Sequence, residues 1–298
     1  MSDWLIALST PASVALVSDL DDLLVRWETL PGDAFERAIM GGALADRLGL
    51  AFAAGYRSAL LALTGETSHA ALCVTEEGGG HPRAIQTRLR CEDGHAFVTG
   101  TKSWATLAGR ARTLLVAASV GRTEGRNELR VVRVPEGVEL AAMPATPFTP
   151  EVPHFGVTLR EVRVPQTAIL EGDGYDMWIK PFRTLEDIHV IAAATAYVVS
   201  VGRRAGWPAP LLAEGLALLA ALEGLAPRPP LEPGVHLALG GVLFGFARWL
   251  ERTSSAWTRV DATVQQRWTR DQPLLRIAGR ARTARFAKAC VQAQLNAE

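Results

Sequence analysis

Cysteine is scarce in this sequence, whose 298 residues include only Cys73, Cys91 and Cys290. These three show neither a Cys-x-x-Cys pair nor the cysteine and histidine spacing of a zinc site, which argues against a disulfide scaffold and against structural zinc. The histidines also lack the His-x-x-x-His and His-x-His spacings of metal sites, so we expect no metal. So few cysteines fit a reducing compartment, and we expect a cytoplasmic protein.

The sequence also has no excess of charge of either sign. Lys plus Arg number 31, as do Asp plus Glu, so the formal net charge is zero. A chain without net charge has no long-range field that attracts nucleic acid or an anionic membrane surface. A nucleic-acid partner is therefore not expected.

Long hydrophobic runs are missing as well. The longest, at residues 188–201, is shorter than the ~20 residues that a membrane-spanning helix needs. The first residues, MSDWLIALSTPASVALVSDL, contain no basic leader, and Asp3 stands where a signal peptide carries Lys or Arg. We expect neither a membrane span nor a secretory leader.

Hydrophobic periodicity divides the chain into three parts and predicts an α+β fold. In residues 1–70 apolar positions recur every three or four residues, with breakers at Pro31 and Gly32, which predicts an N-terminal helical domain. In residues 71–174 the period falls to two between turn residues, which predicts a central antiparallel β-barrel or sandwich. Residues 175–298 predict a C-terminal four-helix bundle. Its helices are expected at 184–205, 209–225, 235–260 and 262–294, the last of which can restart at Pro273.

A glycine-rich stretch, VTEEGGGHP at residues 74–82, is the first candidate for chemistry. A dinucleotide-binding turn needs G-x-G-x-x-G between a strand and a helix, and a phosphate-binding P-loop needs Gly-Lys followed by Ser or Thr. Here Pro82 and the alternating run AIQTRLR follow instead. Taken alone, these residues predict a wide turn between two strands.

The order of several motifs resembles the central β-domain of the acyl-CoA dehydrogenase superfamily. These motifs are LCVTEEGGG (72–80), Asp-Gly (93–94), GTKSW (100–104), Thr106, PEGV (135–138), EVRVP (161–165) and ILEG (169–172), with a weaker likeness in RTLEDIHVIAAA (183–194). By this resemblance the chain is identified as a shortened, divergent member of the superfamily. The resemblance implies an FAD flavoprotein of fatty acid metabolism that introduces an α,β-double bond into an acyl-CoA or similar thioester, with hydride transfer to FAD.

The same resemblance implies which residues contact the flavin. Thr75 would bond the edge of the isoalloxazine ring, Trp104 and Thr106 would cover the ring and bond its polar rim, and Gly80 and His81 would belong to the loop beside it. A flavin needs such groups because its faces require stacking while its ring nitrogens and oxygens require hydrogen bonds. The alternatives are a core tryptophan at Trp104, a turn-capping hydroxyl at Thr75 and a simple exposed loop histidine at His81, where the family usually has serine.

The resemblance also implies a catalytic base at Glu186 or Asp187. Removing the α-proton of a thioester requires a carboxylate held over the substrate. Most relatives carry that carboxylate beyond the point where this sequence ends, and a minority carry it at the start of the first bundle helix, where residues 183–194 align. Acidic residues in a first helical turn are also favoured by the helix dipole, by ~0.3–1 kcal/mol, so a capping role is the alternative.

Two family motifs that hold the FAD of a neighbouring subunit, Arg-x-x-Phe-Gly and Gln-x-x-Gly-Gly, do not occur before Glu298. This puts the affinity for FAD in doubt and leaves two alternatives to a free-standing dehydrogenase. One is a non-catalytic or half-catalytic subunit of a hetero-oligomer, and the other is a flavin-dependent oxidase or monooxygenase on the same fold. Relatives assemble through this bundle, so we expect a homodimer or a hetero-oligomer with a related chain, with an electron-accepting flavoprotein as a further implied partner.

Arginine is concentrated near the end of the sequence, which predicts a basic stripe on the final helical segment. Such a stripe either meets the phosphates of CoA or FAD, or an acidic partner, or is a solvated helix face. The arginines are Arg267, Arg270, Arg276, Arg280, Arg282 and Arg285.

Overall fold

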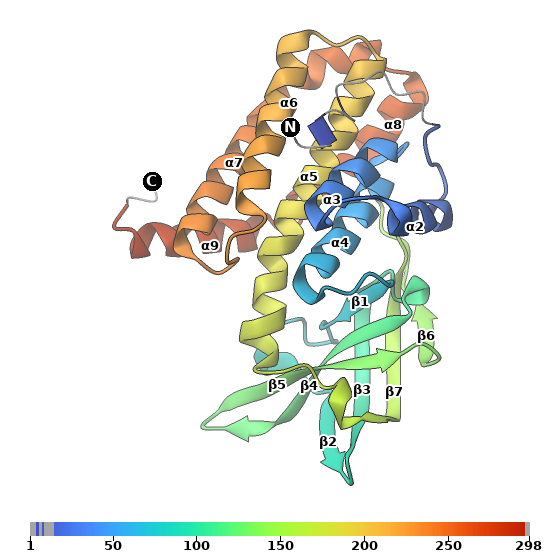
Figure 1. Ribbon diagram of the computed structural model, residues 1–298, viewed down its shortest axis with the longest axis vertical. Coiled ribbons are helices and arrows are strands. Elements are labelled where there is room, and N and C mark those ends of the chain that lie inside the picture. The colour runs from blue at the N-terminus through green and yellow to red at the C-terminus, as the bar shows by residue number, and fades with distance from the viewer. Residues whose placement is uncertain (1–3, 6–7, 9–14, 296–298) are drawn as a thin grey trace. The chain divides into compact units, whose positions relative to one another are not determined.

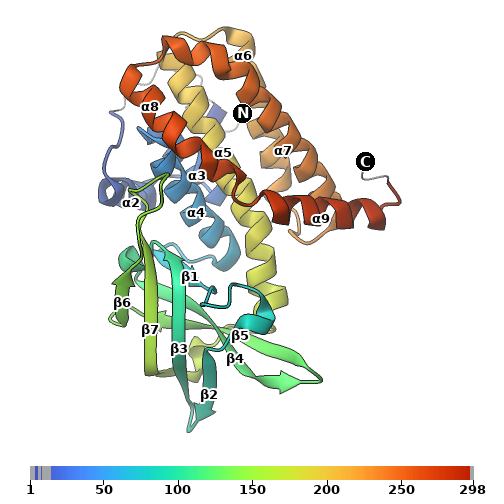
Figure 2. The same cartoon turned by 180° about the vertical axis from the view of Figure 1, so that it is seen from behind.

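The computed structural model describes residues 4–5, 8 and 15–295, shown in Figure 1 and from behind in Figure 2. The expectation about a leader therefore falls mostly outside the described residues. The chain divides into two compact units. The helical unit comprises Met1–Ala62, Pro147–Glu151 and Thr184–Glu298, and the sheet unit comprises Leu63–Thr146 and Val152–Arg183. The helices before and after the sheet thus belong to one unit.

Among the described residues from 15 onward, the helices that precede the sheet in sequence are α2 (Leu20–Thr29), α3 (Ala34–Leu44) and α4 (Leu48–Thr64). Helix α3 begins with a capping box, in which the Asp33 carboxylate accepts from the backbone N–H of Glu36 and the Glu36 side chain accepts from that of Asp33. Only a three-residue turn separates α3 from α4.

The remaining helices of this unit follow the sheet in sequence: α5 (Lys180–Arg204), α6 (Ala209–Leu225), α7 (Pro233–Thr253), α8 (Ala262–Asp271) and α9 (Gly279–Gln292). The predicted helix at 262–294 is thus two helices, separated by a 3₁₀ turn at Gln272–Arg276. Pro273 accounts for the break, because proline offers no backbone N–H to continue the helix. The predicted break is confirmed, but the helix restarts at Gly279 rather than at Pro273.

Helix α5 is the central helix of the unit and packs closely against α3 and α4. A Cβ atom added at Gly42 would lie 2.2 Å from the carbonyl oxygen of Ala193, and one at Gly55 would lie 2.7 Å from the Cα of Val190. Glycine therefore lets the backbones approach. The helical stretch Tyr175–Arg204 is long and apolar enough to cross a membrane, yet 89% of its most apolar window is buried inside the protein, which is typical of a core helix.

The sheet unit is one seven-stranded sheet with the order β1-β4-β2-β3-β7-β6, in which β5 pairs with β4 off that path. Strands β1 and β4 are parallel, whereas β2 and β3, β3 and β7, β7 and β6, and β4 and β5 are antiparallel. The sheet curls into roughly half a barrel, so the predicted α+β class with a central β-domain is confirmed (Figure 1). The strands are β1 (Ala70–Cys73), β2 (Arg88–Glu92), β3 (His95–Thr106), β4 (Thr113–Thr123), β5 (Arg126–Pro135), β6 (Glu139–Ala142) and β7 (His154–Pro165).

One strand and one strand boundary differ from the sequence prediction for physical reasons. Strand β6 was not predicted, because all four of its residues are exposed and the apolar alternation that marks a strand is absent. Strand β2 starts at Arg88 rather than Ala84, because Pro82–Ala84 form a 3₁₀ turn. That turn is fixed by the buried amide of Asn127, which donates to the carbonyl oxygens of Pro82 and Ile85 at 2.9 and 3.0 Å.

Candidate functional site

The glycine-rich stretch after β1 is a tight turn. The backbone N–H groups of Glu76 and Gly79 donate to each other's carbonyl oxygens at 3.2 and 2.8 Å. Gly79 has a φ of 96°, in the left-handed region that side chains disfavour. A turn thus lies where one was predicted, but it is narrow rather than wide, and a 3₁₀ turn at Pro82–Ala84 rather than a phosphate-binding helix follows it.

A buried ion pair fixes this turn to the neighbouring strand. The Nζ of Lys102, whose side chain is fully buried in β3, donates to Glu76 Oε1 at 2.6 Å. The same carboxylate accepts from the backbone N–H groups of Gln86 and Thr87 and from the Thr87 hydroxyl, at 2.6, 3.1 and 2.7 Å. Burial alone would raise the pKa of Glu76, but these donors and the Lys102 charge hold it below the ordinary value. Glu76 is therefore ionised.

A backbone hydrogen bond next to the ion pair joins the turn to β3. The backbone N–H of Ser103 donates to the carbonyl oxygen of Thr75 at 2.8 Å, one residue from each partner of the pair. The pairing of β3 with β7 is irregular between Lys102 and Ala105, and within this bulge Trp104 has a φ of 54°. The bulge turns the indole outward, so Trp104 is 44% exposed. The alternative of a core tryptophan is wrong.

The remaining sequence candidates in the sheet unit lie close by. Thr106 stands opposite His154 in the pairing of β3 with β7, and the His154 ring meets the Trp104 indole edge to face with centroids 5.7 Å apart. Burial lowers the pKa of His154, which favours a neutral imidazole. A Cβ added at Gly80 would lie 3.4 Å from Thr75 Oγ1, so these two residues are neighbours.

His81 is placed differently. It is exposed, and its Nδ1 accepts from the backbone N–H of Arg83 at 3.2 Å, capping the Pro82–Ala84 turn. The Nδ1 atom is therefore committed to local structure, and only Nε2 is left to meet a ligand. The carbonyl oxygen of the preceding residue, Gly80, accepts from Arg183 Nη2 at 3.5 Å.

The two candidate bases, Glu186 and Asp187, belong to the helical unit and sit further into α5 than expected. The helix starts at Lys180 and is preceded by a π-turn at Tyr175–Ile179. Both acids therefore lie beyond the first helical turn. The helix dipole stabilises acidic residues only within that turn. The first-turn capping alternative is wrong.

Asp187 is 3% exposed and bound by two arginines from α9. Arg282 Nε donates to Asp187 Oδ1 at 2.8 Å, and Arg285 Nη2 donates to Oδ2. Both carboxylate oxygens of Asp187 are thus occupied by guanidinium groups. Glu186 is half-buried beside it.

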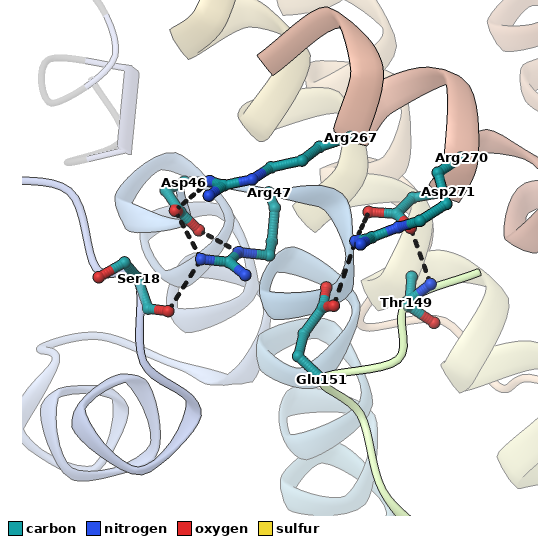
Figure 3. A network of polar contacts seen from close by, with 8 residues as sticks. All are labelled: Ser18, Asp46, Arg47, Thr149, Glu151, Arg267, Arg270 and Asp271. Carbon is teal, nitrogen blue, oxygen red and sulfur yellow. Dashed lines mark hydrogen bonds and ion pairs between the residues drawn. The ribbon is translucent and has the colours of Figure 1, made fainter. Parts of the chain in front are cut away.

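The predicted basic stripe is mostly engaged inside the helical unit. Besides Arg282 and Arg285, Arg267 pairs with Asp46, and Arg270 pairs with Asp271 and Glu151 (Figure 3). Four of the six arginines thus neutralise acids of their own unit. Sequence reasoning missed these pairs and the pair of Glu76 and Lys102, although GTKSW and TEE contain both of the latter residues.

No family model and no curated protein sequence matches the chain. Solved structures do. The prolyl acyl carrier protein oxidase AnaB matches with a TM-score of 0.65 and 16% identity, over 89% of this chain and 85% of that one. FkbI, described as acting in biosynthesis of a methoxymalonyl extender unit, matches with a TM-score of 0.61 and 19% identity, over 97% of this chain and 95% of that one. Butyryl-CoA dehydrogenase from Megasphaera elsdenii matches with a TM-score of 0.61 and 13% identity, over 93% of this chain and 91% of that one.

The protein therefore has the fold of acyl-CoA dehydrogenases and of an acyl carrier protein oxidase. The resemblance inferred from the motif order is confirmed at the level of the fold.

The residues around Trp104 fit a flavin. The outward indole offers a flat apolar surface for stacking. In the part of the chain that the structure describes, no side-chain hydrogen bond engages the hydroxyls of Thr75 and Thr106, so both are available to the polar rim of a ring. The chemistry of this donor set matches a ligand with apolar faces and polar edges.

Proposed function

We propose that the protein is an FAD-dependent oxidoreductase that introduces an α,β-double bond into an acyl thioester. The observation that carries the proposal is the exposed Trp104, which shares strand β3 with Thr106 and follows Ser103, whose backbone N–H donates to the Thr75 carbonyl oxygen next to the buried ion pair of Glu76 and Lys102. Bound FAD would supply the hydride acceptor. Thr75, Gly80, Trp104 and Thr106 would hold its ring, and the remaining nitrogen of His81 would be the fifth contact.

In the proposed reaction, Glu186 serves as the base. Its carboxylate accepts the α-proton while hydride leaves the β-carbon, and the electron pair of the α C–H bond forms the new double bond. Asp187 is the less suitable of the two candidates, because Arg282 and Arg285 each bind one of its oxygens. Its ion pairs with α9 instead hold α5, the helix that carries Glu186, in place.

The acyl carrier is either CoA or a carrier protein. Butyryl-CoA dehydrogenase is named for a CoA thioester, and AnaB is named as an oxidase of a carrier-protein thioester. Either carrier presents the same thioester, so both belong in the test. By the same analogy we propose a cytoplasmic protein of fatty-acid-type metabolism that works as a homodimer or with a related chain.

A non-catalytic or half-catalytic subunit is the second candidate. The observation that favours it is the engagement of Asp187 by two arginines, which leaves Glu186 as the one remaining acid at the expected position. An oxidase of the AnaB type is the third candidate, and it requires the same flavin contacts.

The first experiment is an absorbance spectrum of the purified protein, with acid release of any chromophore and reconstitution with added FAD. We expect flavin bands that bleach without oxygen when an acyl-CoA, or the same acyl group on a carrier protein, is added. Trp104→Ala and Thr75→Ala should weaken FAD binding about tenfold or more, whereas Val120→Ala, an exposed site in the same unit, should not. A protein that stays colourless with excess FAD contradicts the enzyme and favours the subunit.

Glu186→Gln tests the base. The variant should keep its flavin and lose roughly 10²–10⁴-fold in the rate of bleaching, the usual contribution of a positioned base. If Glu186→Gln bleaches normally, the assignment of Glu186 is wrong. Rapid reoxidation of the reduced flavin by oxygen would identify the oxidase.

A further inference from the structure

A cavity of ≈ 540 Å³ lies within the helical unit, and none of the residues assigned above to the flavin or to proton removal lines it. Four separate segments form its wall. They are residues 16–18, the turn between α3 and α4 at Asp46, the last turn of α5, and residues 259–267 at the start of α8. A volume of a few hundred Å³ is typical of sites for small organic ligands.

Three arginines and two aspartates line this cavity, and both aspartates are already engaged. Asp46 accepts from Arg47 Nε and Nη2 at 2.6 and 2.8 Å and from Arg267 Nη1 at 2.7 Å, so two guanidinium groups converge on one carboxylate (Figure 3). Asp261 caps α8 and accepts from the backbone N–H groups of Thr263 and Val264 at 2.9 and 3.4 Å. The cavity therefore keeps an excess of positive charge.

The excess charge belongs to Arg204 and Arg259. Arg204 Nη1 donates to the Ser200 hydroxyl at 2.8 Å, and Arg259 Nη1 donates to the Gly206 carbonyl oxygen at 3.1 Å. Among the described residues neither arginine has a carboxylate within ion-pair distance. A guanidinium carries five N–H donors, so most of theirs remain for a ligand.

A buried hydroxyl lies on the same side of α5. Tyr197, Val201 and Arg204 are spaced i, i+4 and i+7, which places them on one helix face, and the last two line the cavity. Tyr197 is fully buried, and its hydroxyl has no hydrogen-bond partner in the described part of the chain. Its ring lies 6.3 Å from that of Trp268 in α8, between two helices that wall the cavity. Tyr197 itself does not line the cavity, so the polar contacts to a ligand come from the arginines.

The rest of the lining is apolar and comes from Leu16, Val201, Val260 and Val264. We propose that this cavity binds a small organic anion, whose carboxylate or phosphate head lies between Arg204 and Arg259 and whose short apolar body packs on the valines. Guanidinium groups favour such heads because their paired N–H donors match two oxygens at once. This binding activity is separate from the proposed flavin chemistry and does not depend on it.

Isothermal titration calorimetry with the full-length protein tests the proposal, with benzoate and phenyl phosphate as probes and benzyl alcohol as the uncharged control. Both anions should bind, and benzyl alcohol should not. Arg204→Gln and Arg259→Gln should each weaken binding about tenfold or more, since each removes charge-assisted hydrogen bonds. Arg228→Gln, an exposed arginine between α6 and α7, should leave binding unchanged. Added salt should weaken binding of the anions.

Three results would overturn the inference. These are a wild-type protein that binds neither anion, variants at Arg204 and Arg259 that bind as well as wild type, and benzyl alcohol that binds as well as benzoate. Saturating FAD should not displace the probe, and displacement would assign the anion to the flavin site instead. Both arginines are exposed, so their variants should melt as wild type does, which thermal unfolding would verify.

Discussion

At the residue scale, the ion pair of Glu76 and Lys102 should contribute more to the free energy of unfolding than any other contact in the sheet unit. Both groups are buried, and the loop that bears Thr75 depends on them. Removing one partner leaves the other charge buried without compensation. Lys102→Met should therefore lower the free energy of unfolding by about 3–5 kcal/mol, measured by urea denaturation. The double variant Lys102→Met with Glu76→Gln should recover much of the loss, and a single variant as stable as wild type would contradict this view of the pair.

A second prediction at the residue scale concerns pH. His189 in α5 is buried, its Nδ1–H donates to the Leu185 carbonyl oxygen at 2.7 Å, and burial lowers its pKa to about 4. The unfolded chain, with a pKa near 6.5, binds the proton more readily than the folded one, so stability should fall as the pH drops from about 6.5 to about 4. The loss amounts to roughly 3 kcal/mol for a shift of this size.

Unfolding curves at several pH values measure this effect against His189→Gln as the control. The variant carries no titrating ring, so its stability should change less over that interval than the stability of wild type. Equal slopes for the two proteins would show that other groups, and not His189, govern the acid side of the profile.

At the scale of elements, close backbone approach decides how α4 packs on α5. Gly55→Ala should destabilise the protein by about 1–3 kcal/mol, because the new Cβ would lie 2.7 Å from the backbone of Val190. Gly224→Ala, on the exposed side of α6 with nothing within 4 Å, should stabilise it by about 0.5–1 kcal/mol. Thermal unfolding of the two variants should give shifts of opposite sign. A shared sign would mean that helix propensity, not the close approach, dominates.

The segment Pro147–Glu151 provides the prediction at the scale of the whole molecule, since the chain leaves the sheet unit there and contributes five residues to the helical unit. The backbone N–H of Thr149, whose φ is 45°, donates to Oδ1 of the fully buried Asp271 at 2.7 Å (Figure 3). Arg270 joins the same carboxylate to Glu151. This network anchors the segment.

Asp271→Ala should accordingly release the segment. Hydrogen exchange read on peptides that cover residues 147–151 should become faster in the variant, because the Thr149 amide loses its acceptor. Asp261→Ala is the matched control, since it removes an acceptor of the Thr263 and Val264 amides and should change exchange only there. Unchanged exchange at 147–151 in Asp271→Ala would show that other contacts hold the segment.

Much of the element order is encoded locally. The switch of hydrophobic period from about 3.6 to 2 and back marked the helices and strands, the glycines marked the turn after β1, and Pro273 marked the break after α8. These features depend on neighbours within a few residues, so the sequence carries them directly. The exposed strand β6 was not predicted, because it has no apolar alternation.

The candidate site was predictable only in part. Its residues were found through the order of motifs, yet the roles that their side chains play depend on contacts across the fold. Glu76 meets Lys102 from 26 positions away, and Asp187 meets Arg282 from 95 positions away. No local periodicity encodes such pairs.

By itself, the sequence determined the succession of helices, sheet and helices, the turn beside Thr75 and the likeness to acyl-CoA dehydrogenases, because short-range patterns and motif order suffice for these. Only the tertiary structure decided that Trp104 faces outward, that Asp187 is held by arginines, and that Arg204 and Arg259 line one cavity. The physical reason is that burial, charge pairing and cavity walls arise from strand register and helix packing, which join residues far apart in the chain.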